Sequence, residues 1–229
     1  MSTLCLGKSN LSLYETLALY NELFTIILGR KVATLNASMI LQKDQHFIPI
    51  SELLASGLTY YKIKRLVEEG HLTKLNNKMF ENNSYVGEES DFAFASVYAP
   101  KGVICMMSAA RHYGLTTFLP EGVDVSIERN MKISTLPDWP HINLWYFPER
   151  RYSTGVTTAF DGACKFSIYD IEKTIVDIIY YRNKIGIKET KEVLINYLRR
   201  EDRDLIKLYR YSEILGCKKI LRTYMEVLV

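Results

Sequence analysis

Hydrophobic residues recur with helical spacing along the first part of the chain. Residues 12–28, SLYETLALYNELFTIIL, show this spacing and begin at Ser12, a residue type that caps helices. A second helix is predicted over residues 33–42. The proline in Ile48-Pro49-Ile50 interrupts the pattern, and Ser51 can cap a short third helix, ELLAS. The chain therefore begins with helical elements.

The segment from Gly57 to Gly70 has the clearest pattern of all. Gly57 supplies a turn, Thr59 can cap the helix that follows, and Gly70 is the glycine expected after a helix end. At 100° per residue, an apolar stripe flanked by Tyr60 consists of Ile63, Leu66 and Val67. The other side of the helix is basic and aromatic, and it consists of Tyr61, Lys62, Lys64, Arg65 and Glu68.

Two short strands, HLTKL and KMFEN, are predicted after this helix, joined at Asn76-Asn77, a pair that tolerates left-handed turns. A short helix, a glycine turn and a basic helix form the helix-turn-helix arrangement, whose second helix enters the major groove, and the hairpin would be its wing. The predicted DNA-binding residues are Tyr61, Lys62, Lys64, Arg65, Lys74, Asn76, Asn77 and Lys78. The alternatives are an ordinary solvated lysine face and a winged helix that binds protein.

The remainder of the chain mixes both kinds of secondary structure. Residues 81–100 are polar and then aromatic, as in a linker that enters a second domain. One short helix, SAARHYG, and three strand-like runs, VDVSIER, HINLWYF and CKFSIYD, follow before residue 170. Residues 170–229 are helical, with breaks near Gly186, 200–202 and 216–217. We expect an α+β protein with two domains. The first, over 1–88, is an N-terminal helix plus a winged helix-turn-helix, and the second, over 89–229, is a mixed α/β region ending in a helical bundle.

The distribution of charge supports an interface near the basic helix. The chain has 229 residues and a formal net charge of +3. Residues 31–80 contain seven basic and four acidic side chains, whereas the segments on either side are each balanced. A local basic surface is typical of nucleic-acid binders. A purely uneven surface is the alternative interpretation.

Bulk features point to a cytoplasmic protein. No apolar run approaches the roughly 18 residues of a membrane span, and no secretory signal is recognisable. The four cysteines lie far apart without a CxxC motif or a Cys/His cluster, so neither a disulfide framework nor a zinc site is indicated.

Motifs for catalysis are not found in the sequence. It contains no GxxxxGK[ST] phosphate loop, no GxGxxG and no HExxH. A nuclease domain would need metal-binding acids near a lysine. Although Glu121, Asp124 and Glu128 lie in the expected α/β region, no strand ends in an acid-x-lysine pair. We therefore predict no catalytic residues, no metal and no cofactor.

The segment SIYDIEKTIVD, residues 167–177, is the most distinctive part of the second half. Asp170 can cap a helix whose first turn contains Glu172, and both charges suit the helix dipole. Lys173 and Asp177 are four residues apart, away from the isoleucine stripe. The favoured interpretation is an exposed ion pair worth a few tenths of a kcal/mol, and the alternative is a polar contact on an otherwise apolar central helix.

Three segments together resemble the AbiEi antitoxin family of type IV, abortive-infection toxin–antitoxin systems. They are GLTYYKIKRLVEEGHL, PKGVICMMSAARHYGLTT at 100–117, and SIYDIEKTIVDIIYYRNKIG at 167–186 with the following EVLINYLRREDRDL. The resemblance covers roughly residues 32–229, and residues 1–30 carry no motif of the family.

The resemblance implies two activities. The winged helix would bind double-stranded promoter DNA, in repeats, and repress its own operon. The second domain would neutralise a nucleotidyltransferase-like toxin without necessarily forming a stable complex, through a surface that we assign to Arg150, Arg151, Lys173, Asp177 and Arg182. The alternative is a winged-helix protein whose second domain is a nuclease or a protein-interaction module.

Overall fold

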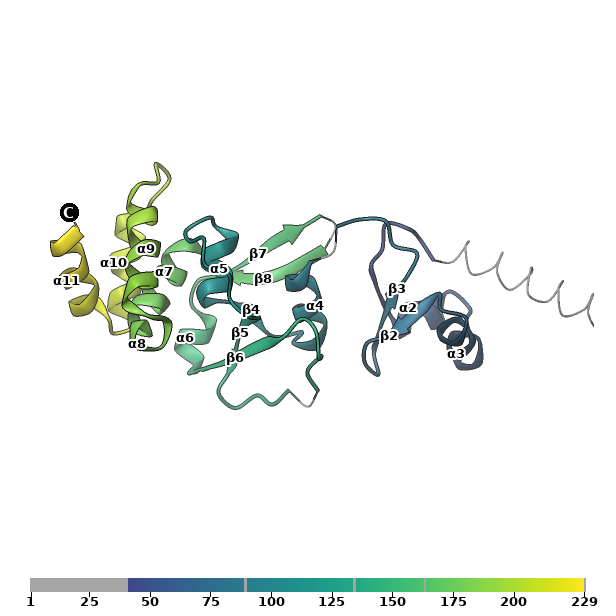
Figure 1. Ribbon diagram of the computed structural model, residues 1–229. Coiled ribbons are helices and arrows are strands. Elements are labelled where there is room, and N and C mark those ends of the chain that lie inside the picture. Colours follow the sequence, from purple (N-terminus) through teal and green to yellow (C-terminus); the bar gives the residue numbers. More distant parts are fainter. Residues whose placement is uncertain (1–40, 89, 134, 163, 229) are drawn as a thin grey trace, which may run out of the picture. The chain divides into compact units, whose positions relative to one another are not determined.

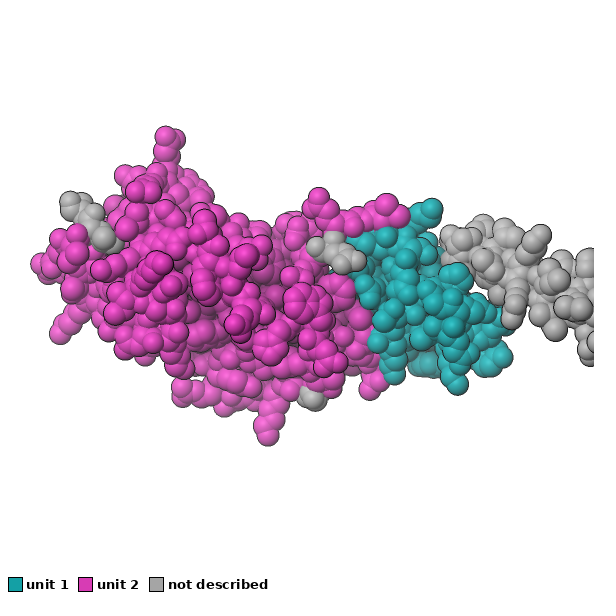
Figure 2. Space-filling view, viewed as in Figure 1, with its two compact units in different colours: residues 1–74, 80–85 teal, residues 75–79, 86–229 magenta. Residues whose placement is uncertain are grey.

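The computed structural model describes residues 41–88, 90–133, 135–162 and 164–228. The predicted helices over 12–28 and most of 33–42 lie outside these residues. The described chain forms two compact units (Figure 2). Among the described residues, the smaller unit contains 41–74 and 80–85, and the larger unit contains 75–79 and those from 86 to 228.

The smaller unit combines two helices with a three-stranded sheet of order β1-β3-β2. Its elements are β1 (Phe47–Pro49), α2 (Ile50–Ala55), α3 (Tyr60–Glu68), β2 (Leu72–Lys74) and β3 (Met79–Asn82). Strands β2 and β3 are antiparallel, as predicted, with Leu72 opposite Asn82. Strand β1 was not predicted, because Pro49 was interpreted only as a break. Helix α2 begins one residue before Ser51 with Pro49 at its N-cap, so the predicted Ser51 cap is wrong.

The larger unit is built on a five-stranded mixed sheet of order β6-β5-β4-β8-β7. Its strands are β4 (Val103–Ile104), β5 (Val123–Glu128), β6 (Ile142–Phe147), β7 (Val156–Asp161) and β8 (Cys164–Tyr169). Its helices are α4 (Asp91–Tyr98), α5 (Met106–His112), α6 (Glu149–Ser153), α7 (Ile171–Tyr180), α8 (Arg182–Ile185), α9 (Ile187–Leu198), α10 (Leu205–Ile214) and α11 (Lys218–Leu228).

Alternating side chains of this sheet enter two different cores. In β4, Val103 belongs to the core shared with α7, whereas Ile104 belongs to the core shared with α4. In β8, Ile168 and Tyr169 divide in the same way. Successive residues of a strand point to opposite faces, so helices must cover both faces of the sheet. Figure 1 shows α4 apart from the group α7–α11.

Helix α7 is the central helix of the larger unit, and it contributes eight consecutive buried residues, Glu172 to Ile179. Its start is set as predicted, since the Asp170 carboxylate accepts a hydrogen bond from the Lys173 amide at 2.9 Å. The predicted breaks near Gly186, 200–202 and 216–217 separate α8, α9, α10 and α11.

The expectation of an α+β protein is confirmed, because both helices and sheets are present. The three predicted strands of the second half are β5, β6 and β8. Strands β4 and β7 and helices α4 and α6 were not predicted, and α4 occupies residues interpreted as a linker. No helix in the described part of the chain combines the length and the apolarity that crossing a membrane requires.

Candidate nucleic-acid interface

The orientation of helix α3 is set by its apolar residues. Ile63 and Leu66 are buried among the eight-residue core of the smaller unit. The Thr59 hydroxyl accepts a hydrogen bond from the Lys62 amide at 3.4 Å, and Gly70 has a φ of 77°, which favours glycine at the helix end. The predicted cap, stripe and stop of this helix are therefore confirmed.

The opposite side of α3 faces outward. We define the basic face of α3 as Tyr61, Lys62, Lys64 and Arg65. The Tyr61 side chain is 71% exposed, Lys62 and Lys64 are exposed, and Arg65 is partly exposed. Tyr60 was predicted to flank the apolar stripe, but it is 67% exposed, because the first turn of the helix extends beyond the core. Tyr60 thus adds a second exposed aromatic ring close to this face.

Two of the three cations on this face are paired within the helix. Lys64 lies 3.6 Å from Glu68, and Arg65 lies 2.7 Å from Glu69. The hydrogen bond from Arg65 to Glu69 raises the pKa of the guanidinium. Lys62 forms no ion pair with any described residue. DNA phosphates would therefore have to compete with two glutamates for these cations. The four-residue spacing in the sequence could have revealed both ion pairs.

The predicted DNA-binding residues of the hairpin differ in their exposure and in their hydrogen bonds. Lys74, at the end of β2, and Lys78 are exposed, and neither forms an ion pair among the described residues. Asn76 is used by the turn itself, since its carboxamide oxygen accepts from the amides of Lys78 and Met79 at 2.8 and 3.0 Å. Its amide nitrogen donates to the Val97 carbonyl at 3.4 Å. Asn77 remains exposed.

The tip of the hairpin, residues 75–79, belongs to the larger unit, whereas Lys74 belongs to the smaller one. The structure therefore brings Tyr61, Lys62, Lys64 and Arg65 together on one helix. Asn76, Asn77 and Lys78 form a separate group, whose Asn76 side chain is occupied by structural hydrogen bonds.

The residues assigned to a neutralising surface are only partly at the surface. Lys173 and Asp177 have fully buried side chains, and Arg151 is buried as well. The predictions that these three residues form part of a surface, and that Lys173 and Asp177 form an exposed ion pair, are both wrong. Arg150 is exposed, and Arg182 is half-buried with a hydrogen bond to the Ile179 carbonyl at 3.4 Å.

The buried charges form a connected cluster, which we call the buried triad: Arg151, Lys173 and Asp177. Asp177 accepts from Arg151 at 2.6 Å and from the Lys173 ammonium, and Arg151 also donates to the Leu215 carbonyl at 2.8 Å. The Lys173 nitrogen lies 3.8 Å from the centre of the Tyr169 ring. Burial lowers the pKa of Lys173, although Asp177 opposes this effect. The triad joins α6, α7 and the α10–α11 turn, and this is a structural role.

In the part of the chain that the structure describes, no group of three or more His, Cys, Asp or Glu side chains is placed to hold a metal ion. Asp124 has an acceptor role in the fold. Its carboxylate accepts from the Met107 amide at 3.1 Å and from the Trp145 indole at 3.1 Å, and burial raises its pKa. This contact holds the start of α5 against the sheet.

Compared with known proteins, the chain matches no family model, and no curated protein is significantly similar to it in sequence.

Proposed function

We propose that the protein is an antitoxin of the AbiEi type and a transcriptional autorepressor that binds double-stranded promoter DNA. The observation that carries the DNA-binding part is the basic face of α3. It lies on the second of two helices joined by a glycine turn, and a β-hairpin follows it. This order is that of a winged helix-turn-helix, in which the second helix enters the major groove.

The chemistry of the basic face of α3 suits DNA. Lys62, Lys64 and Arg65 provide positive charge for phosphates, and exposed Tyr61 and Arg65 can reach base edges. None of the three cations contributes to the core of the smaller unit. Their removal should therefore affect binding without affecting folding.

The first test is a titration of the purified full-length protein with its own promoter at several salt concentrations. The triple variant Lys62→Ala, Lys64→Ala, Arg65→Ala should bind weakly, and its salt slope should fall by about 0.9 for each phosphate that is no longer neutralised. A matched control is Lys188→Ala, Lys191→Ala, Lys219→Ala, which removes three exposed lysines of the larger unit. Unchanged affinity in the α3 triple variant would refute the assignment and favour a protein-binding module.

The antitoxin part is supported by the resemblance alone. The family motif at 167–186 comprises the end of β8, α7 and α8, and α7 contains the buried pair Lys173 and Asp177. The remaining basic candidates for a neutralising surface are Arg150 and Arg182. Co-expression with a neighbouring nucleotidyltransferase-like toxin should restore growth, and the variant Arg150→Ala, Arg182→Ala should restore it less well. Metal-dependent DNA cleavage by the purified protein would support a nuclease instead.

A further inference from the structure

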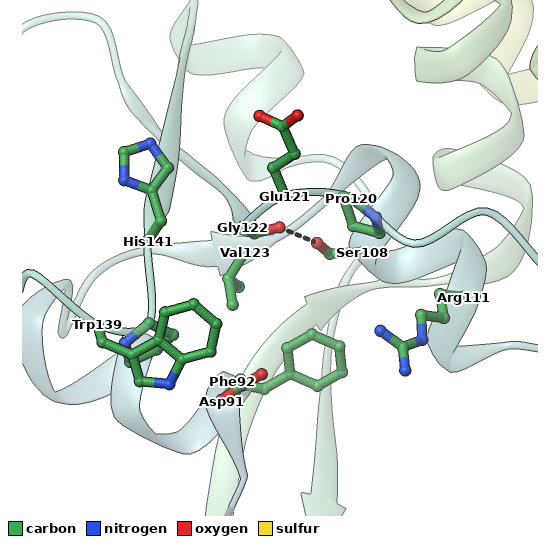
Figure 3. A pocket seen from close by; sticks show the side chains of 11 residues that line it. Asp91, Phe92, Ser108, Arg111, Pro120, Glu121, Gly122, Val123, Trp139 and His141 are labelled. Atoms are coloured by element: carbon green, nitrogen blue, oxygen red, sulfur yellow. Dashed lines mark hydrogen bonds between the residues drawn. The ribbon is translucent and has the colours of Figure 1, made fainter.

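A pocket of about 70 Å³ lies in the larger unit and shares no lining residue with the buried triad (Figure 3). Four segments line it: the start of α4, Ser108 and Arg111 of α5, residues 120–123 and residues 139–141. At roughly 10–15 Å³ for each water molecule, the volume corresponds to about five waters. One planar six-membered ring fits such a space.

The walls of this pocket are held firmly. The Val123 amide donates to the His141 carbonyl at 2.7 Å, and β5 and β6 then continue side by side. A Cβ atom on Gly122 would lie 2.5 Å from the His141 carbonyl oxygen, so only glycine permits this approach of the two segments. On the α5 side of the pocket, the Ser108 hydroxyl accepts a hydrogen bond from the Asp124 amide at 2.8 Å. The pocket is therefore part of the fold and does not depend on a single loop.

Two aromatic rings border the opening. Figure 3 shows Trp139 and Phe92 on different sides of the hollow, with Asp91 near its lower edge and Arg111 beyond Phe92. Phe92 is supported by Phe166, at a centroid distance of 5.3 Å, whereas Trp139 is 73% exposed. An exposed tryptophan opposite a supported phenylalanine provides stacking surfaces for a planar ring.

Two charged groups at the pocket are available to a ligand. Neither Arg111 nor Asp91 forms an ion pair or a side-chain hydrogen bond with any described residue. An unpaired guanidinium suits a phosphate group, and an ionised carboxylate only accepts hydrogen bonds. A ligand for this pocket therefore has a planar ring, an amino group on one side and a negative charge on the other. Glu121 and His141 point away from the hollow in Figure 3.

From this arrangement we propose that the pocket binds a cytidine nucleotide. The pyrimidine ring lies between Trp139 and Phe92, its exocyclic amine donates to Asp91, and its phosphate pairs with Arg111. Carboxylates are the side chains that accept from the cytosine amino group. Uracil presents a carbonyl oxygen at the same position, which Asp91 repels. This inference goes beyond the proposed function, since none of its residues belongs to the basic face of α3.

Tryptophan fluorescence and calorimetry of the full-length protein test the proposal with CMP and UMP as probes. CMP should quench the emission of exposed Trp139 and bind about tenfold more tightly than UMP. Trp139→Phe should abolish the quenching, Arg111→Ala should weaken CMP about tenfold without affecting cytidine, and Asp91→Asn should remove the preference for CMP. Arg129→Ala, an exposed arginine elsewhere, is the control and should bind CMP like the parent.

Equal affinity for CMP and UMP, or quenching that persists in Trp139→Phe, would overturn the proposal. So would binding of free phenylalanine, a zwitterion with a planar ring, in place of CMP. A cytidine trinucleotide tests whether the ligand is a single strand of nucleic acid or a free nucleotide. If the trinucleotide binds more tightly than CMP, the pocket is assigned to a single strand. Equal or weaker binding assigns the pocket to a free nucleotide. Thermal melting of every variant should match the parent, because all three substituted side chains border the pocket and none belongs to a core.

Discussion

Two lysine–carboxylate pairs with the same four-residue spacing lie in opposite environments. In the smaller unit, the side chains of Lys64 and Glu68 are 76% and 60% exposed, whereas those of Lys173 and Asp177 in the larger unit are 0% exposed. An exposed pair contributes little to stability, while a buried carboxylate between two cations is needed to compensate the charges around it. Identical spacing therefore has different consequences in the two units.

The cores explain this difference. The smaller unit has one core of eight buried residues, and its described lysines, arginine, aspartate and glutamates are all at least partly exposed. The larger unit covers both faces of a sheet with helices, and its main core includes 20 buried residues around α7. A helix surrounded on all sides must bury whatever polar residues it carries. The larger unit thus buries a charged cluster among its helices, whereas the pairs on α3 of the smaller unit remain exposed.

Removal of the buried carboxylate should have the largest effect. Asp177→Asn leaves Lys173 and Arg151 buried without a negative charge, and we expect a decrease of about 3–5 kcal/mol in unfolding free energy. Urea denaturation of the full-length protein measures it. Glu68→Gln is the matched change in the exposed pair and should leave stability unchanged within error. If both variants unfold like the parent, the contrast between the two pairs does not hold.

A core substitution in the smaller unit should come next. Leu66→Ala removes a buried side chain from α3 and should cost about 2–5 kcal/mol. Because the two units have separate cores, calorimetry should show an earlier transition for the smaller unit and an unchanged transition for the larger one. DNA binding should disappear together with the fold. Lys62→Ala, on the opposite side of the helix, should melt like the parent, and a Leu66→Ala protein that did so would show that this stripe does not support the core.

The packing around Lys173 allows a finer comparison within the larger unit. Gly155 has a φ of 72°, and an added Cβ would lie 2.7 Å from the Lys173 Cβ. Gly162 has a φ of 56° with nothing within 4 Å of such a Cβ. Gly162→Ala should cost roughly 1–2 kcal/mol from backbone strain alone, and Gly155→Ala should cost more because of the added contact. Equal melting temperatures would indicate that the region near Lys173 accommodates a methyl group.

The smallest expected effect concerns the exposed pairs of the smaller unit. Glu69→Gln frees Arg65 and removes a negative charge from beside the basic face of α3, so promoter affinity at low salt should rise a few-fold. Glu226→Gln is the matched control, because Glu226 pairs with Arg222 at 2.8 Å with the same spacing in the larger unit. A gel-shift titration compares the two, and weaker binding by Glu69→Gln would show that this pair positions Arg65 for DNA.

Much of the local structure was predictable from particular residues. Thr59 and Gly70 delimit α3, Asp170 begins α7, and three of the five strands of the larger sheet followed from alternating side chains. These features depend on neighbours within a few residues. Strands β1, β4 and β7 were not predictable in this way. Strands β1 and β4 have only three and two residues and pair with segments farther along the chain. Strand β7 pairs only with the adjacent β8 at the edge of the sheet, and it has no buried face that would produce an alternating pattern.

In the candidate interface, too, some features follow from neighbouring residues and others depend on distant segments. The outward direction of Lys62 and Lys64 followed from the helical period, and the pairing of Arg65 with Glu69 was implicit in their spacing. The hydrogen bond from the Asn76 side chain to the Val97 carbonyl joins residues 21 positions apart, so it could not be predicted from the hairpin alone. The pocket bordered by Phe92, Arg111 and Trp139 likewise combines segments that are remote in sequence.

By itself, the sequence determined where α3 begins and ends, where α7 begins and which side of α3 is basic, because capping and helical periodicity act over single turns. Only the tertiary structure decided which charges are buried. Lys173 and Asp177 resemble a surface pair in sequence, but α6, α10 and the sheet close around α7 and remove both from water. Burial depends on everything that packs against a residue, and most of what packs against α7 lies far from it along the chain.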